Sequence, residues 1–278
     1  MTIEVIRSRT FSAAITVGLA LLCLASCGSR IERAVDELDG VQHGRDAGIA
    51  LETLASPGFA PFPLVQIAMP SGEKLLPKQI WRHKLIPGKQ ATRYTYERTE
   101  GRHSIKASAV SSASMLRQSV RVDADRLAKL NFSWKVPQLI AGADLTQRET
   151  HDSPVRVVLV FEGDRSKFST KNAMLSELAL ALTGEELPYA TLMYVWCNAC
   201  TAGTAIVSPR TDRIREIIAE AGPARLDQWL EYQRDIRADF EAAFGEPPGA
   251  LLDIGIMTDT DNTRQDTVAW YGPLSLSE

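Results

Sequence analysis

Side chains that bind cations or hydroxyl groups gather near the C-terminus, where Asp259, Asp261 and Asn262 lie within four residues of one another. Carboxylate oxygens at alternate positions suit a hard cation such as calcium, and they equally suit the hydroxyls of a sugar. The spacing is not that of an EF-hand, because no glycine and no glutamate follow at the required places. A turn held by aspartate and asparagine side-chain hydrogen bonds is the alternative without a ligand. The segment therefore predicts a ligand-binding or a purely structural loop, with calcium as the candidate cofactor.

A second charged pair, Asp152 and Arg156, stands at the start of the nearly all-apolar run 155–161. An arginine buried in such a run needs a carboxylate partner. We expect a structural ion pair, with Asp239 or Asp261 as the partner, and keep Asp152 and Arg156 as candidate ligand contacts.

Tryptophans can form a flat platform on which the apolar face of a sugar ring stacks. Trp134 alternates with other apolar residues in a strand pattern, so we expect it in the core. Trp196 and Trp229 lie beside predicted loops or helices and are the better candidates for ligand contact. The five tryptophans of the chain are Trp81, Trp134, Trp196, Trp229 and Trp270.

Two thiols, Cys197 and Cys200, have the spacing of redox motifs. A thioredoxin-like site also needs a helix that begins after the motif in a βαβ unit. Here the pair follows a predicted strand and runs into Thr-Ala-Gly-Thr. We expect a disulfide within a loop, and a metal site is not favoured because the sequence has no second pair.

Catalytic patterns are less well defined. Glycosidases use two carboxylates roughly 5 to 10 Å apart, and sequence alone does not fix that separation. His151 is the histidine with an adjoining acid, but no local serine, histidine and acid pattern is present. GxGxxG, Walker A and GxSxG motifs are also absent from the sequence. The acids that could supply a glycosidase pair are Asp152, Glu162, Asp239, Asp259 and Asp261.

The N-terminal segment has the features of an export signal. Arg7 and Arg9 precede the apolar run 11–24, which is shorter than the about 20 residues of a membrane-spanning helix. The following Leu-Ala-Ser-Cys, ending at Cys27, resembles the bacterial lipobox, in which the cysteine is acylated and becomes the first mature residue. Because Gly28 and not aspartate follows, we expect a lipid anchor in the outer membrane, facing the periplasm.

These signals divide the chain into a signal peptide (1–26), a tether (27–63) and a β-sandwich domain (64–278). The 31 Lys and Arg against 34 Asp and Glu, and a hydrophobic content of 45%, are ordinary for a globular protein. A net charge of −3 argues against a nucleic-acid partner, which would require a basic face.

Hydrophobic periodicity predicts a mainly β protein. Alternation in the segments 92–96, 103–110 and 130–136 indicates strands with one buried side, and the run 155–161 indicates a strand buried on both faces. Many short strands in series favour an antiparallel β-sandwich of jelly-roll type with one or two packed helices. Further strands are expected over 115–122, 190–196, 251–258 and 267–276.

One or two helices are indicated, and a further segment is ambiguous. Leu175, Leu178, Ala179 and Leu182 recur at helical spacing, and Gly184 stands just past the end. A second helix carries the residues Ile236, Phe240, Ala243 and Phe244. The segment 212–222 also fits a helix, through Ile214, Ile217, Ile218 and Ala221.

From Trp81 to Tyr271 the sequence resembles a bacterial family known as domain of unknown function 3047. The resemblance implies an exported β-sandwich, similar in outline to galactose-binding-like carbohydrate modules, and it implies a strand over 212–221. Ser153 departs from the family pattern, where a second aspartate often follows Asp152, and the cysteine pair is a local feature. The residues that carry the resemblance are Trp81, Pro87-Gly88-Lys89, Thr92-Arg93-Tyr94, 111–116, 132–136, 151–157, 192–196, 234–240, 244–248 and 258–263.

Three functions remain open. The first is a non-catalytic module that binds a cell-envelope or extracellular glycan, with its site at 259–263 and Trp196 or Trp229 stacking on the ligand. The second is an enzyme that cleaves glycans with a carboxylate pair. The third is an envelope scaffold or assembly protein without a small ligand.

Overall fold

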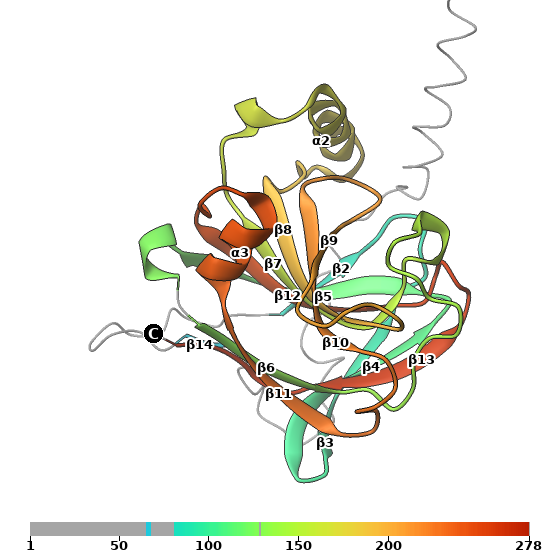
Figure 1. The fold of residues 1–278 in the computed structure, drawn as a ribbon. Coiled ribbons are helices and arrows are strands. Elements are labelled where there is room, and N and C mark those ends of the chain that lie inside the picture. The colour runs from blue at the N-terminus through green and yellow to red at the C-terminus, as the bar shows by residue number, and fades with distance from the viewer. Residues whose placement is uncertain (1–64, 68–80, 128, 278) are drawn as a thin grey trace, which may run out of the picture.

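The computed structural model describes residues 65–67, 81–127 and 129–277, which form a β-sandwich with two helices. In the view of Figure 1, one sheet lies above the other, and the longer helix stands at the top. Within the described residues, no helix is long and apolar enough to span a membrane. The predicted signal peptide, the lipobox and the tether lie outside them.

Each sheet has seven strands, and nearly all neighbouring strands are antiparallel. This architecture confirms the predicted fold class. Sheet A runs in the order β1 (Val65–Ile67), β14 (Leu274–Ser277), β6 (Lys129–Lys135), β13 (Asp266–Tyr271), β4 (Arg102–Val110) and β3 (Arg93–Thr99), with β11 (Trp229–Asp235) also pairing with β6. Sheet B runs in the order β2 (Arg82–Leu85), β5 (Ala113–Val122), β12 (Leu251–Asp259), β7 (Ser153–Phe161), β8 (Ala190–Cys197), β10 (Ile214–Ala221) and β9 (Ala205–Val207).

The core lies between the sheets because alternate side chains of each strand point inward. Leu130, Phe132 and Trp134 of β6 face β7, β8 and β12 across this core. All nine residues of β7 are buried, as the apolar run predicted. The outer face of sheet B carries a second, smaller apolar cluster that includes Leu145, Val158 and Val195.

Helix α2 (Thr170–Thr183) and helix α3 (Ile236–Phe244) both end at a glycine with positive φ, Gly184 and Gly245. This left-handed conformation, which glycine adopts without steric cost, terminates each helix. Helix α3 buries Ile236 and Phe240 against the core, as expected.

The apolar face expected for α2 is correct at Ala179, which is buried, and at Leu175 and Leu178, which are partly buried, but wrong at Leu182. The helix buries Asn172, Ser176 and Ala179, whereas Leu182 is exposed. Asn172 is drawn inward because its side-chain amide bonds Asp212 and its side-chain oxygen accepts from Thr211. The hydrogen bonds of Asn172, in the first turn of α2, thus determine which face of this helix is buried.

The helical interpretation of 212–222 is also wrong, and the strand that the family resemblance implied is present as β10. Ile217 enters the central core, while Ile218 joins the outer cluster. Because both faces of β10 are covered, its apolar residues do not alternate with polar ones, and the pattern mimics a helix. The strand pairs parallel with β8, which departs from the antiparallel arrangement.

Candidate functional site

A buried ionic cluster surrounds Arg156 on the outer side of sheet B. Its Nη1 lies 2.6 Å from Oε1 of Glu216, and its Nε lies 2.9 Å from Oδ1 of Asp259. Its Nη2 donates to the backbone carbonyl of His151. The expected partners were Asp239 or Asp261, but Arg156 bonds instead to residues of β10 and β12, the strands that approach β7 in space.

Asp152 anchors the loop that was predicted to bind a ligand. Its two oxygens accept from the backbone N–H groups of Asn262 and Thr263, at 3.2 and 2.7 Å, and from the Thr263 hydroxyl. Asp261 pairs with Lys89 at 2.5 Å. The asparagine amide of the loop donates to the carbonyl of Arg148. Each candidate ligand-binding residue of this loop therefore forms a hydrogen bond or an ion pair within the protein.

The charges in this cluster shift the pKa values of its carboxyl groups in opposite directions. Burial acts to raise the pKa of Glu216, but the charge of Arg156 and the bond to His151 outweigh it and lower this pKa. Burial raises the pKa of Asp259, and the attraction of Arg156 does not fully compensate. His151 Nε2 lies 3.2 Å from Oε2 of Glu216. These are the features of a structural ion network rather than of an open active site.

Oxygen atoms of Asp152, Asp259 and Asp261 all lie within 4.8 Å of one another, which is close enough to hold a metal ion. Carboxylates are the ligands that calcium prefers. The cluster, however, already contains two cations, since Arg156 bonds Asp259 and Lys89 bonds Asp261. The three carboxylates are thus ligands of the kind that calcium prefers, but Arg156 and Lys89 already balance part of their negative charge.

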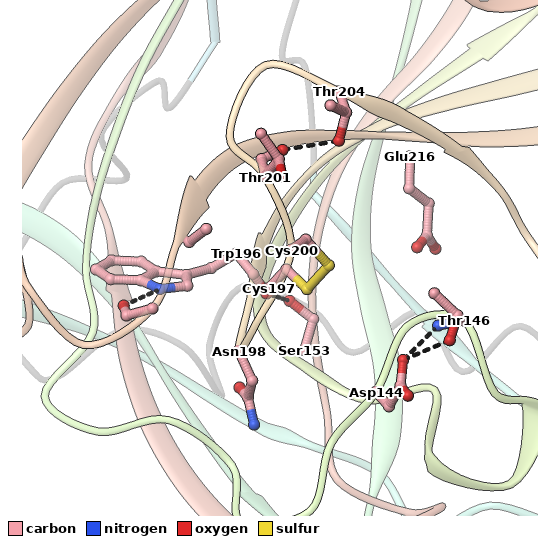
Figure 2. The surroundings of a disulfide bond; sticks show 12 residues. Asp144, Thr146, Ser153, Trp196, Cys197, Asn198, Cys200, Thr201, Thr204 and Glu216 are labelled. Atoms are coloured by element: carbon pink, nitrogen blue, oxygen red, sulfur yellow. Dashed lines mark hydrogen bonds between the residues drawn. A yellow bond between two sulfur atoms is a disulfide. The ribbon is translucent and has the colours of Figure 1, made fainter.

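The disulfide predicted between Cys197 and Cys200 is present (Figure 2). The side-chain amide of Asn198, between them, donates to the carbonyl of Ile140 at 2.7 Å and holds the loop in place. The preceding Trp196 is 0% exposed, and its indole N–H donates to the carbonyl of Gly222. This burial leaves Trp196 no surface on which a ligand could stack.

The other candidate acids lie apart from this cluster. Asp239 bonds the guanidinium of Arg234 and the Tyr194 hydroxyl, and Glu162 pairs with Arg121. Among the described acids considered for catalysis, Asp152, Asp259 and Asp261 lie within 4.8 Å of one another, and Asp152 and Asp259 are buried. Their burial does not fit a glycosidase pair, which must reach the substrate.

The outer face of sheet A brings together residues that the sequence left far apart. Trp229 of β11 is directly opposite Lys135 of β6, and Lys135 is directly opposite Trp270 of β13. Trp270 is in turn opposite Lys106 of β4. We call these four residues the tryptophan row. Side chains paired in this way point to the same face of a sheet, and both tryptophans of the row are partly exposed.

Polar contacts hold the tryptophan row in place. Guanidinium and ammonium groups lie over the two indoles, from Arg102 at 5.5 Å from the Trp229 ring centre and from Lys106 at 5.6 Å from that of Trp270. The indole N–H of Trp270 donates to Glu97 at 2.5 Å. Each cation lies over one face of its indole and is attracted by the electron-rich ring.

Lys135 is the buried centre of the row. Its side chain is 8% exposed, and its ammonium bonds Glu100 at 2.5 Å and Asp227 at 2.9 Å. Both acids are well exposed and come from turns. These hydrogen bonds raise the pKa of Lys135.

The sequence analysis selected one residue of this face, Trp229, as a candidate for ligand contact. It did not select Trp270, which lies on the same face, or Lys135, which lies between the two tryptophans. Trp270 carried a signal, since it alternates with buried residues in β13 and so faces outward. β11, β6 and β13 are adjacent because of pairing between strands that are distant in sequence, and no local sequence pattern predicts such pairing.

Solved structures match this chain at low sequence identity and low TM-score. The glycoside hydrolase domain of Endo-D from Streptococcus pneumoniae is 12% identical, with a TM-score of 0.31, over 70% of this chain and 21% of that one. The chain thus spans about a fifth of that protein. A family 11 carbohydrate-binding module of a cellulosomal cellulase from Clostridium thermocellum is 8% identical, with a TM-score of 0.35, over 70% and 85% of the two chains. The xyloglucanase domain of NopAA, a type three effector from Sinorhizobium fredii, is 8% identical, with a TM-score of 0.37, over 71% and 92%.

No residue role is carried over from structures at this level of similarity. Among curated proteins, no significant match to the chain is found. A family model, in contrast, matches residues 79–275, which include nearly all of the described sandwich. The chain therefore belongs to the family described as Protein of unknown function (DUF3047).

Proposed function

We propose that this chain is a cell-envelope lipoprotein whose β-sandwich binds a glycan without cleaving it, and that the outer face of sheet A is the binding surface. The observation that carries this proposal is the tryptophan row. Two partly exposed indoles stand in register on one polar sheet face, with Lys135 between them.

The geometry of the row suits an extended chain of sugars. Trp229 and Trp270 lie on the two strands that flank β6. Because neighbouring strands are about 4.8 Å apart, their backbones are separated by about 10 Å. Two aromatic faces at this separation can each contact a different part of one oligosaccharide.

Polar groups next to the indoles can bond the sugar hydroxyls. Glu97 and Glu231 supply acceptors, while Arg102 and Lys106 supply donors. Alternating apolar and polar contacts of this kind are typical of binding sites that recognise a specific orientation of their ligand.

The charges on this face favour binding over catalysis. Each carboxylate near the row already bonds a cation or an N–H group: Glu97 bonds Trp270, Glu231 bonds Arg102, and Glu100 bonds Lys135. A general acid needs a carboxyl whose pKa is raised. Within the described residues, burial raises the pKa of Asp259, but this carboxyl is enclosed in the ionic cluster of sheet B and not on sheet A.

The lipid anchor is proposed from the sequence around Cys27. The lipobox-like Leu-Ala-Ser-Cys follows an apolar run too short to span a membrane. Acylation there, with the segment 27–63 as a tether, would hold the sandwich near the membrane surface and leave sheet A able to meet envelope glycans.

The test is a glycan-array screen of the full chain in a mild detergent, with wild type compared with Trp229→Ala and Trp270→Ala. Selective binding that either substitution abolishes supports the proposal. Leu180→Ala is the control, because this exposed side chain lies on α2 and not on sheet A. Unchanged melting temperatures separate loss of contact from loss of fold.

Two results would overturn the proposal. Wild-type protein that binds no glycan would favour the scaffold function. The release of new reducing ends from a bound glycan would instead favour the cleaving enzyme.

A further inference from the structure

The acids that cover Lys135 both have positive φ, a backbone conformation that aspartate tolerates and glutamate rarely adopts. Glu100 has φ 52° and Asp227 has φ 57°, two of only four non-glycine residues with positive φ in the described chain. Such a conformation is unfavourable for an L-residue with a long side chain. Two separate turns therefore have positive φ at the residue whose carboxylate bonds Lys135.

Glu100 is the clearer case. With Gly101, at φ 80°, it forms the two-residue turn between β3 and β4. Turns with positive φ at both central positions prefer asparagine, aspartate or glycine, not glutamate. The glutamate is therefore not explained by the turn, but its longer side chain reaches Lys135 Nζ.

Asp227 reaches the same ammonium from the other side. Its backbone N–H donates to the carbonyl of Val136 at 2.8 Å, directly after Lys135, and this bond fixes the acid beside the end of β6. In the described part of the chain, Glu100 and Asp227 each bond Lys135 through one oxygen. The second oxygen of each carboxylate can accept a further hydrogen bond.

The charge around Lys135 itself is net negative, because two carboxylates, Glu100 and Asp227, meet one ammonium there. Glu100 and Asp227 are also exposed, with side chains 55% and 72% accessible. An anionic ligand would meet these two carboxylates first and be repelled.

From these observations, and resting on the proposed function, we infer that the tryptophan row selects uncharged glycans. Glu100 and Asp227 determine this selectivity by accepting hydrogen bonds from hydroxyl groups of a sugar that lies over Lys135, between Trp229 and Trp270. Lys135 holds both carboxylates in position. Hydrogen bonds to ionised acceptors are stronger than those between neutral groups, so both acids contribute substantially to affinity.

The experiment measures binding by isothermal titration calorimetry with the full chain in detergent. The probes are four neutral hexasaccharides, of β-linked glucose, xylose, mannose and N-acetylglucosamine, and one acidic hexasaccharide of galacturonate. We expect at least one neutral probe to bind and the galacturonate probe to bind at least tenfold more weakly.

Two substitutions keep the turns and remove the carboxylates. Glu100→Asn suits its turn better than glutamate does, and Asp227→Asn keeps the shape of the side chain. Each is expected to weaken binding of the neutral probe about tenfold or more, as loss of a hydrogen bond to a charged group would. The melting temperature should fall only modestly, because the other carboxylate still pairs with Lys135. Glu162→Gln is the matched control, since Glu162 is similarly exposed and paired with an arginine on sheet B.

The outcomes separate this inference from the proposed function. If neutral probes bind through the tryptophans but both asparagine variants keep wild-type affinity, the inference is overturned and the proposed function stands. Equal or tighter binding of galacturonate also overturns it. If no probe binds to the wild-type protein, both the inference and the proposed function are overturned.

Discussion

Arg156 and Glu216 form an ion pair inside the protein, with Nη1 and Oε1 2.6 Å apart and side chains only 2% and 0% exposed. The pair joins β7 to β10 across β8, the strand between them. Two buried charges are costly to remove from water, and they persist where several hydrogen bonds satisfy them. The pair therefore fixes the relative position of three strands of sheet B.

Removal of Glu216 should strongly destabilise the fold. Glu216→Ala leaves part of the charge of Arg156 buried without its partner, which typically costs about 3 to 5 kcal/mol. The measurement is the free energy of unfolding in urea. Glu162→Ala, which breaks a pair whose side chains are 64% and 50% exposed, should cost less than about 1 kcal/mol. Equal effects of the two substitutions would contradict a structural role for the buried pair.

The free energy of unfolding should fall as the pH decreases below about 5. The pKa of Glu216 is lowered by folding, so its stabilising contribution is present above its usual value of 4.5 and is lost as the pH falls through the lower, folded value. Asp259, whose pKa is raised by burial, acts in the opposite direction. Four more carboxyls have lowered pKa values, so the loss should dominate; they are Asp144, Asp164, Glu185 and Glu246.

Thermal unfolding at several pH values between 3 and 7 checks this expectation. Glu216→Gln should lower the melting temperature at neutral pH and make its decrease in acid shallower, because one of the titrating groups is gone. A variant with the same acid dependence as wild type would show that Glu216 does not contribute to it.

Local patterns in the sequence were sufficient for most elements of the fold. The alternation in β6 correctly placed Leu130, Phe132 and Trp134 on a buried face, although Lys135 on the other face is buried as well. The unbroken apolar run of β7 correctly identified a strand buried on both faces. The hydrophobic pattern did not predict β10 as a strand, because its two apolar faces pack against different clusters. It did not predict the exposure of Leu182 on α2 either, because the hydrogen bond from Asn172 to Asp212 sets the orientation of this helix.

The candidate sites depended on information that the sequence does not contain. Arg156 was rightly expected to need a carboxylate, but its partners come from β10 and β12, which are distant along the chain. Trp229 was rightly distinguished from Trp134 by its place beside a loop. Its relationship to Trp270 follows from two strand pairings of β6, and only the folded sheet brings them into one row.

Substitution of Cys27 should release the protein from membranes. Without the thiol no acyl chain can be attached, and several chains are what make such anchoring stable. The test is the distribution of wild type and Cys27→Ala between membrane pellet and supernatant after cell disruption. Substitution of Ser29, close to the same junction but outside the lipobox, is the control. A Cys27→Ala protein that still pellets fully would exclude the lipid anchor.

The Cys197–Cys200 pair should resist alkylation if the protein is exported as proposed. Disulfides persist in oxidising compartments, and this one closes a short loop beside the buried end of β8. Intact protein treated with iodoacetamide should gain no label at these residues without reductant and two labels after reduction under denaturing conditions. Free thiols in freshly isolated protein would show that the pair is reduced in its compartment.

Calcium should leave the stability of the protein unchanged, although three carboxylates lie within 4.8 Å of one another. Arg156 and Lys89 already supply positive charge to Asp259 and Asp261, so a divalent ion would have to compete with both cations. Thermal unfolding with millimolar calcium and with chelator should therefore give the same melting temperature. An increase with calcium that Asp261→Ala abolishes would instead identify a metal site.

Within this cluster, Asp259→Ala should destabilise the fold far more than Asp261→Ala. Asp259 is buried and accepts from both Arg156 and the backbone N–H of Ser153, so its loss leaves two buried donors without an acceptor. Asp261 pairs with Lys89, whose side chain is 32% exposed and can bond water instead. Urea unfolding of both variants measures the difference. If the two lose similar stability, or if Asp259→Ala is neutral, then the cluster is not what holds this end of the sandwich together, and its acids would be free for a ligand.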